Sequence, residues 1–113
     1  MYKKRFLVKE GKSHVPIKTH EIAYFNRDDD FVFIELFKGK TYIIDMSINS
    51  LETVLDPKVF IRLSRKILAN IDSIIELYKE GQDIFEITLS ANKLIKIPVS
   101  REKYYIIKSF LSE

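Results

Sequence analysis

Short blocks of apolar residues, many of them alternating with polar residues, recur along most of the chain and predict a protein built mainly from β-strands. Glycines and clusters of polar residues separate the blocks, which indicates turns between consecutive strands. The last three blocks follow one another closely and are expected to form an antiparallel meander. The predicted strands are Arg5–Val8, His14–Lys18, Glu21–Phe25, Phe31–Phe37, Thr41–Met46, Ile71–Lys79, Ile84–Ser90 and Leu94–Val99.

Three of these strands have patterns that predict how they are placed. Phe31–Phe37 is apolar at nearly every position, so we expect it to be covered on both faces within the core. Apolar and polar residues alternate in Ile84–Ser90, which predicts one buried face and one solvent face. Pro16 cannot donate a hydrogen bond to a neighbouring strand, so the strand that contains it is expected at an edge or at a bulge.

Two segments show helical rather than strand spacing. Ser47 is a suitable N-cap for a short helix, which must end before Pro57 because the residue before a proline avoids the helical conformation. Ser100 is a suitable N-cap for a C-terminal helix, which we expect to pack on the sheets by one broad apolar stripe. The apolar positions are Ile48, Leu51, Val54 and Leu55 in the first helix and Tyr104, Ile106, Ile107, Phe110 and Leu111 in the second.

The bulk composition is that of a folded globular chain. A length of 113 residues predicts one domain, residues 1–113, with one hydrophobic core. Hydrophobic residues make up 46% of the chain and charged residues 31%, a balance that excludes a disordered chain. The chain has no cysteine, and no apolar run approaches the roughly 18 residues of a membrane span. We therefore expect a cytoplasmic protein without disulfides and without a membrane partner.

None of the common catalytic motifs is present. There is no Gly-rich phosphate loop, no His-Glu-x-x-His and no supported nucleophile, so we expect no enzymatic activity, no catalytic residue and no cofactor. The two histidines, His14 and His20, lack a ligand pattern, which favours surface roles over a metal site. The run Asp28–Asp30 lacks the alternating ligands of a calcium loop, which favours a solvated turn.

The net charge of +3 is small, but positive charge is concentrated in two stretches. Lys58–Asn70 holds four Lys or Arg and no acid, and Lys3–Lys12 holds five against one glutamate. A phosphate backbone would favour such patches. In Lys3–Lys12 the same residues would equally serve to protect exposed strand edges and to keep the protein soluble.

The basic stretch carries a sequence motif, and the start of the last helix carries a second one. The first motif consists of Phe60, Arg62, Arg65, Leu68, Asn70 and Ile74, and the second of Val99, Ser100 and Arg101. Further matches run in order from Phe6 to Leu111, among them Glu21-Ile22, Tyr24-Phe25, Gly39-Lys40, Leu51-Glu52 and Pro57. In this ordered set the chain resembles the LytTR-type DNA-binding domains, the output domains of many bacterial response regulators. The resemblance implies a mainly β fold of small packed antiparallel sheets, a short middle helix that supports the first motif, and a C-terminal helix.

The resemblance also implies a function and partners. It implies sequence-specific binding to double-stranded DNA in transcription regulation, with loops in successive major grooves, DNA bending, and a second copy on adjacent repeats. A receiver domain or a kinase is expected to act upstream of such a module, so the chain is either a fragment of a longer two-component regulator or a stand-alone regulator. The alternative is a non-enzymatic protein-interaction or ligand-sensing β module that uses the aromatic strand Phe31–Phe37 as its binding face.

Arg65 and Arg101 occupy the positions for which the resemblance implies contacts with DNA bases. A guanidinium group presents a planar donor fork that fits guanine O6 and N7 in the major groove and also fits phosphate. We expect the two side chains to lie on one side of the protein. The residues expected to contact the DNA backbone or to support these contacts are Arg62, Ser64, Lys66, Asn70 and Ser100.

Several of these positions have a second interpretation. Arg62 would equally form a structural ion pair, and Asn70 would equally form a turn by bonding its own backbone. Ser64 stands where members of the family often have His, so the base preference is expected to differ. The loop at Asp28–Asp30 faces DNA in the family, but here its acids must point away from phosphate or accept hydrogen bonds from cytosine.

Overall fold

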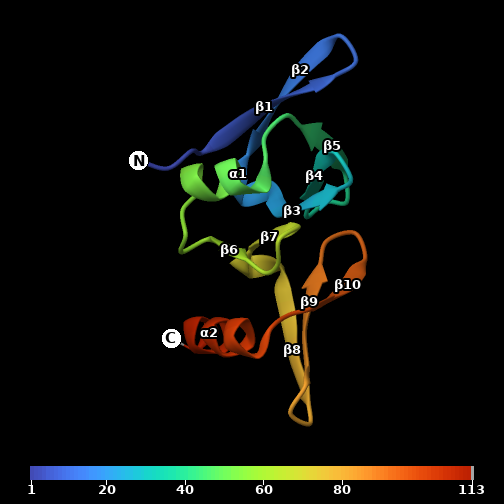
Figure 1. Ribbon diagram of the computed structural model, residues 1–113. Coiled ribbons are helices and arrows are strands. Elements are labelled where there is room, and N and C mark those ends of the chain that lie inside the picture. The colour runs from blue at the N-terminus through green and yellow to red at the C-terminus, as the bar shows by residue number, and fades with distance from the viewer. Residues whose placement is uncertain (113) are drawn as a thin grey trace.

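The computed structural model describes residues 1–112 and contains three antiparallel sheets in an elongated body of 50 × 28 × 24 Å (Figure 1). The strands are β1 (Arg5–Glu10), β2 (Ser13–Lys18), β3 (Ile22–Asp28), β4 (Phe31–Leu36), β5 (Thr41–Ile44), β6 (Phe60–Arg62), β7 (Ile67–Asn70), β8 (Ile74–Glu80), β9 (Ile84–Ser90) and β10 (Leu94–Pro98). The α-helices are α1 (Ile48–Val54) and α2 (Arg101–Leu111), and short 3-10 turns span Thr19–Glu21 and Ile71–Ser73. The predicted mainly β fold with a middle and a C-terminal helix is confirmed.

The hairpin of β1 and β2 forms a sheet of its own at the upper end of the body (Figure 1). Phe6 and Val8 on β1 and Ile17 on β2 point into the core, and each is 2% exposed. Pro16 lies opposite Leu7, in a strand whose other edge is unpaired because the sheet has only two strands. The edge position predicted from the proline is confirmed.

The five-stranded sheet in the middle, with the order β5-β4-β3-β7-β6, carries a hydrophobic cluster on each face. Phe25 of β3 and Leu68 of β7 belong to the cluster with α1 and the hairpin, whereas Tyr24 and Ala69 belong to the cluster with the three-stranded sheet. A register shift at Ile22 marks a β-bulge, which returns Ile22 to the same face as Phe25. Strands β3 and β7 are therefore the doubly covered centre of the fold.

The prediction that the strand Phe31–Phe37 is covered on both faces is wrong. Val32, Ile34 and Leu36 on β4 are buried, but the other face is only half covered, and Phe31 is 56% exposed. The apolar cluster on that face is centred on β3 and β7, and β4 lies beyond β3 toward the edge strand β5. The doubly buried strand is instead β7, all four of whose residues are buried.

The two largest corrections to the predicted strand boundaries concern the end of β3 and the start of β8. Strand β3 continues to Asp28, so the turn before β4 is confined to Asp29 and Asp30, with Asp29 at a positive φ of 53°. An aspartate tolerates this left-handed conformation better than most residues. The strand predicted from Ile71 begins at Ile74, because Ile71–Ser73 form a 3-10 turn.

The C-terminal sheet, with the order β10-β9-β8, is the predicted meander, and α2 packs beside it at the lower end of the body (Figure 1). Tyr104 and Ile107 are the buried residues of α2, and the Tyr104 ring lies 5.1 Å from that of Phe85 on β9. The prediction that one broad apolar stripe of α2 packs on the sheets is wrong in its width, since Ile106 is 48% and Leu111 is 40% exposed. The helix contacts the sheet mainly through β9 and along one narrow line. Within residues 1–112, no helix is both long enough and apolar enough to cross a membrane.

Candidate nucleic-acid interface

The first motif folds into the β6–β7 hairpin at the edge of the five-stranded sheet, with residues 63–66 as its loop. The Leu63 amide donates a hydrogen bond to the carbonyl oxygen of Ile67 at 3.0 Å, which closes the loop. The Leu63 side chain is 3% exposed, whereas Arg65 and Lys66 are exposed. The hairpin therefore presents two cations on a loop whose base is anchored in the core.

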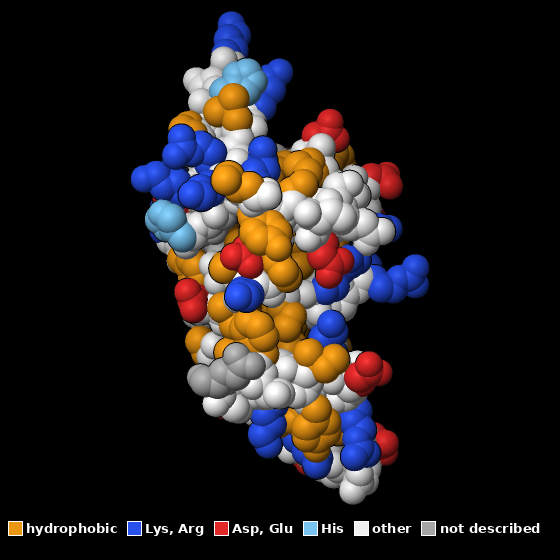
Figure 2. Space-filling view, turned by 90° about the vertical axis from the view of Figure 1, so that its left-hand side faces the viewer, with side chains coloured by type: hydrophobic (Ala, Val, Ile, Leu, Met, Phe, Trp, Pro, Cys, Tyr) orange, Lys and Arg blue, Asp and Glu red, His pale blue; other side chains and the backbone are white. Residues whose placement is uncertain are grey.

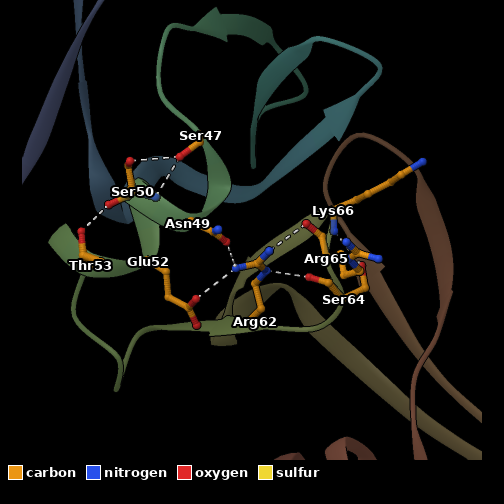
Figure 3. A network of polar contacts seen from close by, with 9 residues as sticks. All are labelled: Ser47, Asn49, Ser50, Glu52, Thr53, Arg62, Ser64, Arg65 and Lys66. Carbon is orange, nitrogen blue, oxygen red and sulfur yellow. Dashed lines mark hydrogen bonds and ion pairs between the residues drawn. The ribbon is translucent and has the colours of Figure 1, made fainter.

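The guanidinium group of Arg62 holds this loop in place (Figure 3). Its Nε donates to the carbonyl oxygen of Ser64 at 2.7 Å, and its Nη2 donates to the carbonyl oxygen of Arg65 at 2.8 Å. Its Nη1 lies 2.9 Å from Oδ1 of Asn49 and 3.0 Å from Oε1 of Glu52. All three nitrogens of Arg62 are thus engaged within the protein, and the predicted alternative of a structural ion pair is confirmed.

The two side-chain partners of Arg62, Asn49 and Glu52, come from α1, which lies beside the loop in Figure 3. Ser47 caps this helix by accepting a hydrogen bond from the Ser50 amide at 3.0 Å, as predicted. The cap fixes the first turn, from which Asn49 projects, and Glu52 follows three residues later. The middle helix therefore supports the first motif, as the family resemblance implied.

The side chain of Arg65, unlike that of Arg62, is exposed and forms no ion pair within residues 1–112. The two ion pairs within residues 1–112 are Glu10 with Lys40 and Glu52 with Arg62, so neither involves Arg65. The Ser64 hydroxyl accepts a hydrogen bond from the Lys66 amide at 3.2 Å, which uses Ser64 to shape the loop. The structure thus divides the predicted residues into those that build the loop and those that project from it.

Arg27 is a basic residue of this surface that sequence reasoning missed. Its amide donates to the carbonyl oxygen of Lys66 at 2.8 Å, and its Nε donates to the carbonyl oxygen of Asp29 at 3.2 Å. Arg27, Arg62 and Arg65 line one shallow depression together with Ser47, Ile48 and Asn49. Arg27 follows the predicted strand Glu21–Phe25 and precedes three aspartates, so the sequence alone places it in the polar segment before Phe31. Only the pairing of β3 with β7 brings it beside the loop.

Asn70 is a structural residue and has no access to a ligand. It is 2% exposed, its Nδ2 donates to the carbonyl oxygen of Ile22 at 3.0 Å, and its Oδ1 accepts from the Asp72 amide at 2.9 Å. Asn70 therefore caps the 3-10 turn and ties it to β3. The predicted turn-forming role is confirmed, and a direct contact of this side chain with DNA is excluded in this conformation.

The second motif forms the start of α2. The Ser100 hydroxyl accepts a hydrogen bond from the Lys103 amide at 3.0 Å, so Ser100 is the predicted N-cap. Arg101 is the first residue of the helix and is exposed. A cation is unfavourable at this end of a helix, but Glu102 in the same turn compensates for part of the effect.

Tyr105 and Lys79 support Arg101, and sequence reasoning singled out neither. The Arg101 guanidinium carbon lies 5.8 Å from the centre of the Tyr105 ring, one helical turn further on. Nζ of Lys79 on β8 donates to the Tyr105 hydroxyl at 2.9 Å, and the Tyr105 ring also packs edge-on against Phe85. The hydrogen bond from Lys79 lowers the pKa of Tyr105, and the charges of Lys79 and Arg101 act in the same direction.

Asp28, at the end of β3, and the turn residues Asp29 and Asp30 are all exposed, as predicted for a solvated acidic segment. Asp29, Asp30 and Asp45 line a depression that they share with Arg27. No group of three or more acidic or histidine side chains within residues 1–112 is arranged to hold a metal ion.

The segments that carry Arg65 and Arg101 contact the same hydrophobic cluster. Leu63, two residues before Arg65, is part of the cluster between the five-stranded and three-stranded sheets, and Val99, two residues before Arg101, packs against it. The loop and the start of the helix are therefore held by neighbouring parts of one core.

Comparison with known proteins decides the family. The sequence profile described as the LytTr DNA-binding domain matches residues 12–112. The chain belongs to the LytTR family of DNA-binding domains. LytTR domains are DNA-binding domains and are typical of the output domains of response regulators.

A solved structure supports the LytTR fold independently. It is described as the LytTr DNA-binding domain of a methyl-accepting/DNA response regulator from Bacillus cereus. The two chains superimpose with a TM-score of 0.78 at 19% sequence identity, over 98% of this chain and 99% of the other. At this identity the likeness concerns the fold. A comparison with curated proteins found no match.

Proposed function

We propose that this LytTR domain is a sequence-specific transcription regulator whose Arg65 and Arg101 contact bases in the major groove of a repeated promoter site. Arg65 does so from the β6–β7 loop, and Arg101 does so from the start of α2. Each guanidinium group offers the donor fork that fits O6 and N7 of guanine.

The main support for this proposal is that Arg62 and Arg65 have different roles: Arg62 is hydrogen-bonded within the protein, and Arg65 is exposed. Arg62 donates its hydrogen bonds to the loop carbonyl oxygens and to Glu52 of α1, and these bonds fix the backbone that carries Arg65. The Arg65 side chain is exposed and forms no ion pair within residues 1–112. The braced loop has little backbone freedom to lose on binding, and the Arg65 guanidinium breaks no ion pair before it meets a base, which favours a specific contact.

Phosphate contacts are assigned to the cations beside these two residues. Lys66 is exposed on the same loop, and Arg27 lines the depression next to Arg65. Contacts with phosphate orient a protein on the duplex and carry no base preference. Ser64 and Ser100 support the interface through the backbone hydrogen bonds that they accept, whereas Asn70 stabilises the fold that carries it.

The domain acts as the output part of a two-component response regulator and binds as two copies on adjacent repeats. Family membership supports this assignment, as does the description of the Bacillus cereus domain as part of a response regulator. A receiver domain or a kinase upstream would then control how often two copies meet on the same DNA.

The test begins with selection of a binding site from random duplexes. Wild type, Arg65→Ala and Arg101→Ala are then titrated on the selected duplex and on a scrambled one, at two salt concentrations. Each substitution should cost about 1–3 kcal/mol on the selected duplex and much less on the scrambled duplex. If both variants keep the affinity and specificity of the wild type, the site assignment is wrong.

A further inference from the structure

We propose that the outward face of the β1–β2 hairpin is a second DNA contact, which binds phosphates flanking the site contacted by Arg65 and Arg101. This inference rests on the proposed function, because the flanking DNA is the duplex on either side of the site that Arg65 and Arg101 contact. The hairpin contact is independent of base sequence and extends the footprint of the domain along the DNA.

The register of the hairpin gathers basic side chains on one face. Strand alternation turns Phe6 and Val8 inward and leaves Arg5, Leu7 and Lys9 exposed on the opposite face, with Leu7 between the two cations. Arg5 lies directly opposite Lys18, another exposed residue, and Lys9 lies directly opposite His14. Figure 2 shows Lys, Arg and His side chains gathered at the upper end of the molecule, which carries this hairpin.

These cations are not neutralised within the protein. Within residues 1–112, no carboxylate forms an ion pair with Arg5, Lys9 or Lys18. The glutamate of this hairpin, Glu10, pairs with Lys40 at 3.2 Å. Asp45 lines the groove beside Lys9 and His14 but forms no ion pair with Lys9.

The cross-strand pair of two cations, Arg5 and Lys18, favours a role in binding an anionic partner over a role in solubility alone. Like charges directly opposite each other on neighbouring strands are destabilising, and Arg5 with Lys18 is such a pair. Solubility is served by charges of both signs, and protection of a strand edge does not require two cations directly opposite each other, so neither role accounts for this cost. An anionic partner with regularly spaced charges relieves the repulsion, and the phosphate backbone has this chemistry.

The position of the hairpin favours the same duplex over a separate acidic protein. The hairpin occupies one end of the 50 Å body, the β6–β7 loop lies near the middle, and α2 lies toward the other end (Figure 1). The family profile begins at residue 12, so β1 and its cations lie outside the matched region. A duplex that runs along the long axis of the body over the loop and α2 would reach this end.

The experiment compares the full chain with two triple variants. Arg5→Ser/Lys9→Ser/Lys18→Ser removes the three charges, and Arg5→Lys/Lys9→Arg/Lys18→Arg keeps them. All three positions are exposed, and circular dichroism with thermal unfolding checks that each variant is folded. Affinity is measured over a range of salt on three duplexes: the selected site alone, the site extended on both sides by one helical turn of unrelated sequence, and an unrelated duplex of the extended length.

On the extended duplex, the slope of log affinity against log salt should fall by about 2.7 in the serine variant, because each phosphate that the protein no longer neutralises lowers the slope by about 0.9. The charge-keeping variant should retain the wild-type slope. The preference for the selected site over the unrelated duplex should be the same in all three proteins.

Two results would overturn the inference. One is a serine variant with the wild-type slope and affinity on the extended duplex. The other is a slope that falls equally on the short duplex, which would place the contact inside the site. Failure of the proposed function looks different, since the wild type would then not distinguish the selected from the unrelated duplex. The comparison of slopes on the unrelated duplex would still test the hairpin.

Discussion

Nη2 of Arg62 donates a hydrogen bond to the carbonyl oxygen of Arg65 at 2.8 Å, so the first arginine of the motif holds the backbone of the second. The same guanidinium group reaches Ser64 on the loop and Glu52 on α1 (Figure 3). Two residues of the same type, three positions apart, therefore have different roles. Arg62 belongs to the framework, and Arg65 belongs to the surface that a ligand meets.

Replacement of Arg62 should affect folding and DNA binding together. Arg62→Ala leaves the loop carbonyls of Ser64 and Arg65 without their donor, which should lower the free energy of unfolding by about 2 kcal/mol. The released loop should also bind the selected duplex less tightly. Urea denaturation and a binding titration on the same preparation measure both effects.

Glu52→Gln is the matched control for Arg62. The amide oxygen can still accept from Nη1 of Arg62, and the pair is largely exposed at Glu52, so the change should cost less than about 1 kcal/mol. DNA affinity should stay close to that of the wild type. Equal losses for Arg62→Ala and Glu52→Gln would show that the ion pair, and not the loop contacts, carries the effect.

Asn70 should matter for stability alone. Asn70→Ala removes a buried donor and a buried acceptor and leaves the Ile22 carbonyl oxygen and the Asp72 amide without partners, at a cost of about 2–3 kcal/mol. The fraction of protein that remains folded should bind DNA with the wild-type affinity. The exposed turn residue Asn92 is the control, and Asn92→Ala should change stability by less than about 0.5 kcal/mol. Reduced affinity per folded molecule of Asn70→Ala would contradict the structural role.

The Tyr105 ring should contribute to DNA affinity through Arg101. Tyr105→Leu removes the ring over which the guanidinium lies and should weaken binding by about 0.5–1 kcal/mol, whereas Tyr105→Phe keeps the ring and most of the affinity. In the Arg101→Ala background, Tyr105→Leu should have no further effect on affinity. Additive losses in the double variant would show that the two residues act separately.

The ionisation of Tyr105 provides a test by pH. Because Lys79 donates to its hydroxyl, Tyr105 should ionise below the ordinary tyrosine pKa of 10.0, and Lys79→Met should raise the pKa toward that value. A pKa that is lower in the folded state means that folding releases a proton between the folded and unfolded pKa values. The contribution of this group to stability should therefore increase with pH in that window and be absent below it. Tyrosinate absorbance and denaturation at alkaline pH measure the two effects, and an unchanged pKa in Lys79→Met would contradict the contact.

The local patterns of the sequence predicted most of the elements and the caps. Ser47 and Ser100 cap their helices as expected, because capping depends on residues within one turn. The broad stripe on α2 and the double cover of β4 were wrong for a common reason. An apolar pattern shows which residues can be buried, whereas the area that a neighbouring sheet covers depends on packing between distant segments.

The site was only partly predicted, because the sequence shows local motifs but not which distant segments pack beside them. The motif identified Arg62 and Arg65 but left Arg62 between a contact with the DNA backbone and a structural ion pair, since its side-chain partners lie 10 and 13 residues earlier in the chain. Arg27 was not recognised as part of the basic surface, because three aspartates follow it and its structural neighbour Lys66 is distant in sequence. Tyr105 has helical spacing from Arg101, which was the available signal for that pair.

The most direct measurement of the central claim compares Arg65→Lys and Arg101→Lys with the wild type, on the selected site and on variants with each base pair changed in turn. Lysine keeps the positive charge but loses the planar donor fork. Each variant should keep the wild-type salt dependence and lose about 1–3 kcal/mol of discrimination, at different base pairs for the two positions. If both lysine variants discriminate among the sites as the wild type does, neither arginine contacts a base, and the account is contradicted.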